Sequence, residues 1–274
     1  MEVKTLEKSK DGMKISFLLK GANTYFANTL RRIIAEEVPT MAIEDVEFRD
    51  NSSSLYDEIV AHRLGLVPFK TDLKSYVLPS ECKCKGKGCQ SCQLKMTLVA
   101  KGLTAGTTVY AKEIKTKDPK VKPVYPKMPV VKLLKSQKIE LEAVATLGKG
   151  KEHAKWSPGL VYYKDYPVIE IKKQPKNPEQ CVASCPVNVF ELKKDQISIN
   201  KDNLLKCHLC QACADISEGA INVTGNNEDF IFTVESWGQL DARDIVKHAV
   251  KLVHNKLDDF SKSLAEIKKK KKKK

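Results

Sequence analysis

Apolar residues recur at helical spacing near both ends of the chain. Phe26, Leu30, Ile33 and Ile34 follow one another at i, i+4, i+7 and i+8, which predicts an amphipathic helix from Asn23 or Thr24 to about Glu37. A second helix is predicted from Asp241 to about Ile267 by apolar residues at Ile245, Ala249, Leu252, Val253, Leu257, Phe260, Leu264 and Ile267. A helix of that length spans ~40 Å. Its sustained apolar face favours packing along a partner over packing on this chain alone.

Between these helices the pattern favours short strands. Strands are expected near 14–19, 41–48, 95–100, 107–111, 138–145, 168–171 and 230–236. Ser54 and Asp57 have the spacing of a capping box, which predicts a short helix over 55–64 that stops at Gly65. Prolines between 119 and 129 predict a loop, and the glycines at 148 and 150 predict a turn.

The second of two cysteine clusters has the spacing of a bacterial ferredoxin. Cys181-x3-Cys185-Pro186 is followed by Cys207-x2-Cys210-x2-Cys213. In two-cluster ferredoxins, the cysteine before proline ligates the cluster held by the other run. One complete set of four thiolates therefore follows, and we expect it to bind one iron–sulfur cluster: Cys185, Cys207, Cys210 and Cys213.

The other ferredoxin set is broken, which leaves Cys181 over. Pro175, Pro178 and Ser217 stand where its remaining ligands would be, and we expect a solvated hydroxyl at Ser217. A zinc tetrahedron is the alternative for the complete set, but three cysteines at successive x2 spacing suit a cubane corner better. A [4Fe–4S] cluster is favoured, with [3Fe–4S] left open.

The first cysteine cluster predicts a structural zinc knuckle. Four thiols fall within eleven residues of a glycine-rich, lysine-rich loop: Cys82, Cys84, Cys89 and Cys92. Four closely spaced cysteines are typical of closed zinc sites, which leave no open position for a substrate. Nearby lysines are expected to lower the thiol pKa values. Two local disulfides or four free thiols are the alternatives.

Composition excludes several classes of protein. None of the apolar runs among the 274 residues approaches the ~18 needed to span a membrane. The N-terminus does not resemble a signal peptide, and nine cysteines in metal-like spacing indicate a reducing cytosol, so we expect a cytoplasmic protein. Seven of the +14 net charges lie in the tail 268–274, which we expect to be disordered. No nucleophile–base constellation, phosphate loop or Asp-x-Asp-x-Asp triad indicates catalysis by this chain.

Four segments resemble the alpha-type subunits of DNA-directed RNA polymerase. They are 28–32 (NTLRR), 38–43 (VPTMAI), 57–69 (DEIVAHRLGLVPF) and 150–156 (GKEHAKW). The last two segments, with the ferredoxin-like insertion, are most similar to the archaeal D-type members of this family, the counterparts of the third-largest eukaryotic subunit and of bacterial alpha. The resemblance covers nearly the whole chain except the lysine tail.

The resemblance implies an α+β fold: an alpha-type dimerisation domain with a β-rich insert domain and a ferredoxin-like iron–sulfur module. The expected parts are 1–44 (dimerisation domain), 45–167 (insert with the cysteine-rich loop), 168–223 (iron–sulfur module), 224–267 (dimerisation domain) and 268–274 (tail). It also implies that such a subunit is not catalytic. It pairs with the small alpha-like subunit L, joins the small zinc-binding subunits N and P, and supports the large catalytic subunits.

The expected partner surface combines the two helical stripes. Residues expected in partner contact, or in the core behind it, are Phe26, Leu30, Ile33, Ile34, Leu252, Leu257, Phe260 and Leu264. We then expect this chain to contact DNA only indirectly, through the polymerase complex. An electron-transfer protein of the ferredoxin type is the alternative suggested by the cysteines, and a nucleic-acid-binding protein is a third, suggested by the charge.

Overall fold

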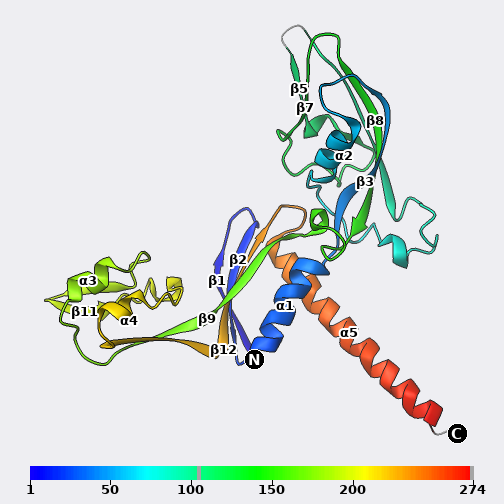
Figure 1. Ribbon diagram of the computed structural model, residues 1–274. Helices are drawn as coiled ribbons and strands as arrows, with labels where there is room; N and C mark the ends of the chain where they lie inside the picture. The colour runs from blue at the N-terminus through cyan, green and yellow to red at the C-terminus, as the bar shows by residue number, and fades with distance from the viewer. Residues whose placement is uncertain (104–105, 272–274) are drawn as a thin grey trace. The chain divides into compact units, whose positions relative to one another are not determined.

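The computed structural model describes residues 1–103 and 106–271, which form a mixture of helices and strands (Figure 1). This mixture agrees with the expected α+β class. The chain divides into two compact units, and each is assembled from stretches far apart in the sequence. The first unit comprises Met1–Glu7, Ser16–Thr29 and Tyr162–Thr233, and the second comprises Lys8–Ile15, Leu30–Val161 and Val234–Lys274.

A four-stranded sheet joins the N-terminal strands to two strands from the second half of the chain. Its strand order is β1-β2-β12-β9, with β1 at Glu2–Lys8, β2 at Lys14–Lys20, β12 at Ile221–Ser236 and β9 at Gly159–Ile171. The Ser16 hydroxyl of β2 donates to the Phe232 carbonyl of β12 at 3.0 Å, and the rings of Phe17 and Phe232 stack with centroids 5.2 Å apart.

Three strands of this sheet differ from the prediction. β1 was not predicted, because most of its side chains are exposed and backbone pairing at a sheet edge leaves no apolar pattern. Strands β9 and β12 are longer than the predicted 168–171 and 230–236. They are neighbours in the sheet, and backbone hydrogen bonds pair their polar as well as their apolar segments.

The N-terminal helix α1 (Thr24–Glu36) confirms the predicted cap and end. The Phe26 amide donates to the Asn23 carboxamide oxygen at 2.8 Å, which satisfies one of the free N–H groups of the first turn. The helix ends three residues before Pro39. Leu30, Ile33 and Ile34 are buried, so most of the predicted stripe belongs to this chain's own core.

The second helix begins later than predicted. Helix α2 spans Asp57–Gly65, and its N-cap is Tyr56, which makes no side-chain capping bond. The predicted capping box at Ser54 is therefore wrong. The segment before α2 is instead held by Asn51, whose carboxamide donates to the Leu55 carbonyl at 2.9 Å and to Asp57 at 2.7 Å. The predicted stop at Gly65 is confirmed.

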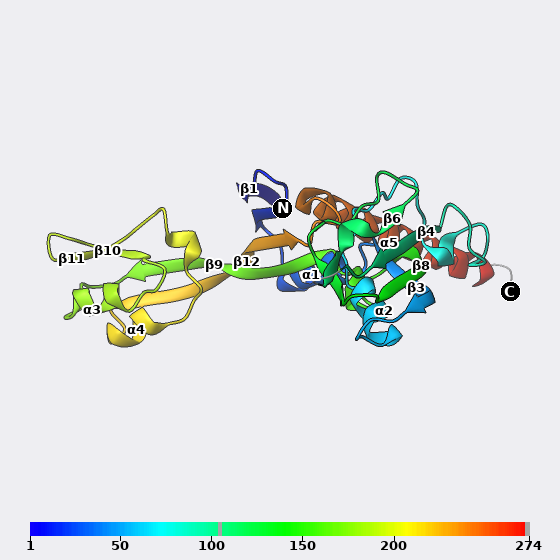
Figure 2. The same ribbon diagram turned by 90° about the horizontal axis from the view of Figure 1, so that it is seen from above.

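The insert region has its own apolar core. Its strands can be followed in Figure 2. One sheet has the order β3-β8-β4-β6, with β3 at Thr40–Asn51, β8 at Lys138–Gly148, β4 at Gln93–Lys101 and β6 at Lys115–Thr116. A second sheet pairs β5 (Thr107–Tyr110) with β7 (Pro129–Leu133). Short 3-10 turns stand at η1 (Pro79–Glu81), η2 (Ala111–Glu113) and η3 (Ala154–Trp156).

The prolines from 119 to 126 lie in a loop as predicted, whereas the strand that follows them was not predicted. Strand β7 starts at Pro129, where the missing N–H costs nothing at a strand end. Val130, Val131 and Leu133 are then buried in the insert core.

The segment 148–156 packs against β3 and β8. The Thr40 hydroxyl donates to the Trp156 carbonyl at 2.8 Å, and the Trp156 indole donates to the Thr146 carbonyl at 3.3 Å. A Cβ at Gly148 would lie 2.3 Å from the Trp156 ring, so the chain can pass the indole there only as glycine. The predicted turn is confirmed, and its function is packing.

The cysteine-rich module of the first unit contains short elements. They are α3 (Pro178–Ala183), β10 (Phe190–Lys193), β11 (Gln196–Ile199), η4 (Leu204–Lys206) and α4 (Ala212–Ile216). The predicted hairpin is present, since β10 and β11 pair antiparallel from Phe190↔Ile199 to Lys193↔Gln196.

The last helix, α5 (Ala242–Lys271), is 30 residues long. It continues four residues past the predicted end, so the predicted tail 268–274 begins as helix, and its residues 272–274 lie outside the described part of the chain. Within the described residues, no helix is both long and apolar enough to cross a membrane.

Candidate metal centres and helical interface

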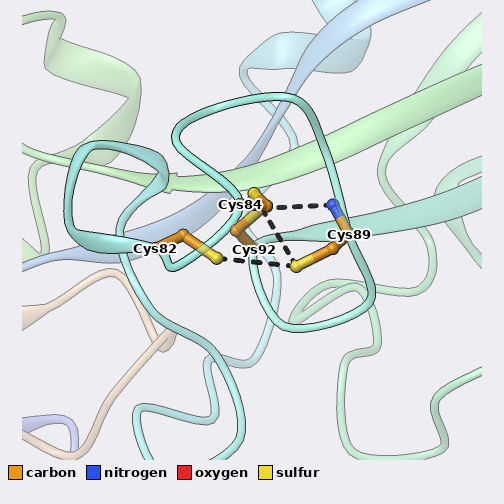
Figure 3. A group of neighbouring side chains, drawn as sticks. All are labelled: Cys82, Cys84, Cys89 and Cys92. Carbon is orange, nitrogen blue, oxygen red and sulfur yellow. Dashed lines mark hydrogen bonds between the residues drawn. The ribbon is translucent and has the colours of Figure 1, made fainter.

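The cysteines of the insert loop converge on one point (Figure 3). The Sγ atoms of Cys82 and Cys89 are 3.5 Å apart, as are those of Cys84 and Cys92, and those of Cys89 and Cys92 are 3.8 Å apart. A zinc tetrahedron with Zn–S bonds of about 2.3 Å has sulfurs roughly 3.8 Å apart. The residues present therefore fit a tetrahedral thiolate site.

The backbone of this loop bends as a tight knuckle requires. Lys85, Gly86 and Gly88 have φ values of 53°, 79° and 86°, in the left-handed region. The Cys89 amide donates to Cys92 Sγ at 3.4 Å. Such bonds stabilise a thiolate, because they place a partial positive charge against the sulfur.

Interactions among the thiols of the knuckle, together with burial, shift their pKa values in opposite directions. A hydrogen bond from Cys82 is the largest cause that lowers the pKa of Cys84, to about 6. Burial is the main cause that raises the pKa of Cys92, to about 12. The lysines of the loop are exposed and are not among the causes. The expectation that lysines lower these pKa values stays a prediction.

The ferredoxin-like cysteines line a cavity, whereas the thiols of the insert loop meet at one point. It is lined by Cys185, Cys207, Cys210 and Cys213, by apolar Val187, Val189, Phe190 and Val223, and by Ser184, His208 and Gln211. Among the described residues, only the insert set has all of its ligand atoms within 4.8 Å of one another. A wider set around a cavity is what a multi-atom cluster held at its corners needs.

Local geometry and charge in the module also fit a cluster. Leu209 and Gln211 have φ values of 59° and 68°, so left-handed residues alternate with the cysteines of the Cys207–Cys213 turn. Backbones of this kind form concave nests of N–H groups that bind anions and iron–sulfur clusters. Burial first, and then the charges of the other three cysteines, raise the pKa of Cys213 to about 11. The four thiols are thus close enough to interact.

Cys181 and Ser217 lie away from that cavity. Cys181 is fully buried in the apolar core of the module. Ser217 is 6% exposed, donates to the Ala214 carbonyl at 3.0 Å and accepts from the Ile221 amide at 3.0 Å. The expectation of a solvated hydroxyl is wrong, because this side chain caps the last turn of α4.

One residue beside the cavity was not predicted from the sequence. Lys164 of β9 is half-buried and donates to the Cys207 carbonyl at 2.7 Å. Burial lowers the pKa of Lys164, and the charge of Cys207 acts in the opposite direction. The two residues are 43 positions apart, so no local spacing could have indicated the contact.

Helix α5 changes character along its length. Ala242, Ile245 and Ala249 are at most 1% exposed, whereas every side chain from His254 to Glu266 is exposed. Leu257, Phe260 and Leu264 are 58%, 63% and 45% exposed and follow at i, i+3 and i+7. Leu252 is intermediate, as is Phe26 of α1. The Lys256 ammonium pairs with Glu37, just after α1, at 2.9 Å.

Comparisons with known proteins agree with these features. Residues 43–160 match the RNA polymerase Rpb3/RpoA insert domain. Similar over nearly the whole length are proteins named DNA-directed RNA polymerase subunit Rpo3. That of Methanosphaera stadtmanae is 40% identical over 258 residues, covering 92% of this chain and 95% of the relative. That of Methanosarcina acetivorans is 38% identical over 263 residues (95% and 97%), and that of Archaeoglobus fulgidus 38% over 268 (97% and 98%).

These features and matches define the class of alpha-type RNA polymerase subunits, which confirms the resemblance noted in the sequence. The chain belongs to the family of DNA-directed RNA polymerase subunit Rpo3. It is thus part of an enzyme complex that makes RNA and is not itself the catalyst.

Proposed function

We propose that this chain is an assembly subunit that pairs with a small alpha-like subunit through the exposed half of α5. The observation that carries the proposal is the apolar stripe Leu257, Phe260 and Leu264 on a helix whose first turns are buried in its own unit. Contiguous exposed apolar surface of this kind marks an interaction site. Obligate subunit interfaces commonly bury roughly 2,000 Å² or more, and a helix of this length can contribute a large part of that area.

The position of the stripe supports pairing with another helical subunit. The buried start of α5 anchors it, since the Ala242 amide donates to the Gly12 carbonyl at 2.9 Å and Ile245 is fully buried. The ion pair between Lys256 and Glu37 connects its middle to the end of α1. The partner then covers the outer half of α5, and Phe26, which is half-buried on α1, stays a separate proposed contact.

The complex follows from the family of the relatives, which are named as subunits of DNA-directed RNA polymerase. In the proposed assembly this chain binds subunit L, the pair joins the small zinc-binding subunits N and P, and together they support the large catalytic subunits. Contact with DNA is made by the complex. A cytoplasmic location goes with that role.

We further propose that the two cysteine sets bind different groups. Cys185, Cys207, Cys210 and Cys213 would hold one iron–sulfur cluster, with [4Fe–4S] favoured over [3Fe–4S]. Cys82, Cys84, Cys89 and Cys92 would hold one zinc ion. Both groups would act by cross-linking short segments of the chain, which gives the cluster a structural role; regulation through its loss is a second role to be tested.

Two measurements test the proposal. The chain is produced anaerobically with and without the small alpha-like subunit, and complex formation is followed by size-exclusion chromatography. We expect a 1:1 complex and an unstable or self-associating free chain. A well-behaved monomer that never binds the partner contradicts the assembly role. Iron, acid-labile sulfide and zinc are measured on the same sample, and a chain that contains neither iron nor sulfide contradicts the cluster.

A further inference from the structure

Lys164 stands directly behind one of the cysteines that line the cluster cavity. It is half-buried on β9, and its ammonium donates to the Cys207 carbonyl at 2.7 Å. Removing an ammonium from water is unfavourable unless a strong partner compensates. A neutral carbonyl offsets part of that cost, and negative charge nearby would stabilise the ammonium further.

The geometry supplies that charge on the far side of Cys207. The carbonyl of Cys207 faces Lys164, whereas its side chain lines the cavity with the other three cysteines. Four thiolates around an iron–sulfide core carry net negative charge. Lys164 does not line the cavity, so it can act on a cluster only through the ligand's backbone and through its charge.

The other lysine close to this ligand is oriented differently. Lys206 immediately precedes Cys207, but it is exposed and its ammonium donates to the Asn203 side chain at 2.8 Å. Solvent screens its charge. Lys206 is therefore a matched control: it is next to the same cysteine in sequence, but its ammonium bonds to Asn203 and not to the Cys207 carbonyl.

We propose that Lys164 is a positioning residue for the iron–sulfur cluster, holding the Cys207 backbone in place and a positive charge behind this ligand. The inference rests on the cluster proposed above. The contact between β9 and the Cys207 turn slows loss of the cluster, because outer hydrogen bonds orient a ligand before it binds. The positive charge stabilises the reduced, more negative state, so it raises the reduction potential.

The test uses the full chain with its small alpha-like partner, purified anaerobically. Lys164→Met removes the charge and the hydrogen bond, Lys164→Gln keeps a donor without the charge, Lys164→Arg keeps the charge, and Lys206→Met is the control. Circular dichroism establishes that each variant is folded. The readouts are iron and sulfide per chain, the rate at which an iron chelator bleaches the cluster absorption, and the midpoint potential in a redox titration.

We expect Lys164→Met to lose its cluster roughly tenfold faster or more than the wild type, the usual scale for loss of an outer hydrogen bond at a metal ligand. Its midpoint potential moves to a more negative value, as does that of Lys164→Gln. Lys164→Arg and Lys206→Met stay close to the wild type. If Lys164→Met does not fold, the potential of Lys164→Gln decides the question.

Three outcomes overturn the inference. Unchanged bleaching rate and potential in both neutral variants remove the role of Lys164 while leaving the cluster in place. An equal shift in Lys206→Met shows that any nearby charge suffices. A wild-type chain without iron and sulfide overturns the cluster itself, and the inference with it, and this result is distinct from the first two.

Discussion

At the scale of residues, Asp72 shows how a single carboxylate connects two loops of the insert. It accepts from the Ser75 hydroxyl at 2.7 Å, from the Lys120 ammonium at 2.9 Å and from the Lys74 amide at 2.9 Å. The Ser75 hydroxyl, followed by Lys120, holds the pKa of Asp72 well below its usual range. Lys120 is 48 positions away, so the sequence did not indicate this contact.

Asp72 predicts a loss of stability in acid. Because its pKa is lowered in the folded chain, its contribution is complete above the unfolded pKa near 4 and disappears as pH falls toward the folded pKa. Urea unfolding from pH 7 to pH 2 should show Asp72→Asn to be less stable at pH 7, by about 1 kcal/mol, and to have a flatter acid limb. The control is Asp45→Asn, an exposed aspartate on β3. An acid limb that keeps its wild-type slope in Asp72→Asn contradicts the assignment.

A substitution at Cys92 tests the zinc knuckle. Cys92 is 1% exposed and contacts two other thiols, so Cys92→Ser removes a ligand from a closed site. Zinc should fall well below one per chain, and the insert should lose on the order of several kcal/mol of stability, since metal binding is folding free energy here. The checks are metal analysis and denaturant unfolding. Cys181→Ala, at an equally buried cysteine outside the knuckle, should keep its zinc; full zinc in Cys92→Ser would rule out this ligand set.

At the scale of elements, local patterns located helix α1 better than the strands β1, β9 and β12. Asn23 and Pro39 predicted the ends of α1, because capping bonds and proline geometry are local. Strand β1 and the polar halves of β9 and β12 were not predicted, because partners distant in sequence determine their pairing. The start of α2 was misplaced for a local reason: the side chain of Asn51, at the end of β3, holds the segment that precedes the helix.

At this scale, we predict that a charge in the exposed half of α5 weakens binding of the partner subunit. Leu257→Asp places a charge on the apolar stripe, and burying it unpaired at an interface is costly. Because Leu257 is 58% exposed, the free chain should unfold within about 0.5 kcal/mol of the wild type, whereas binding of the small alpha-like subunit should weaken by tenfold or more. Asn255→Asp adds the same charge on the opposite face of the helix. Equal binding of both variants and the wild type in a pull-down would remove the stripe from the interface.

At the scale of the whole molecule, two of the apolar cores in the described part of the chain, those of the insert and of the cysteine module, are built from different parts of the chain. The insert core contains residues from Met41 to Leu147, and the module core contains residues from Cys181 to Val223. Each of these two cores has its own cysteine set, so loss of one metal group should lower the stability mainly of the core beside it.

Cys207→Ser tests this separation. We expect loss of the cluster, faster amide hydrogen exchange across 181–223, and unchanged exchange in β4 and β8 of the insert. We also expect weaker assembly with the partner subunit. Hydrogen exchange with mass spectrometry makes the measurement, and Cys181→Ala is again the matched control. Exchange that rises equally in both cores, or assembly untouched by complete cluster loss, would contradict a structural role confined to the module.

The sequence by itself determined the three longest helices, the two cysteine sets and the family, because caps, periodicity and ligand spacing act over a few residues. The tertiary structure decided which members of each stripe are buried: Ile34 lies in the core of this chain, whereas Leu257 and Phe260 are exposed. It also decided that one cysteine set meets at a point while the other encloses a cavity, and that Lys164 lies behind Cys207. These facts depend on chain segments that only folding brings together.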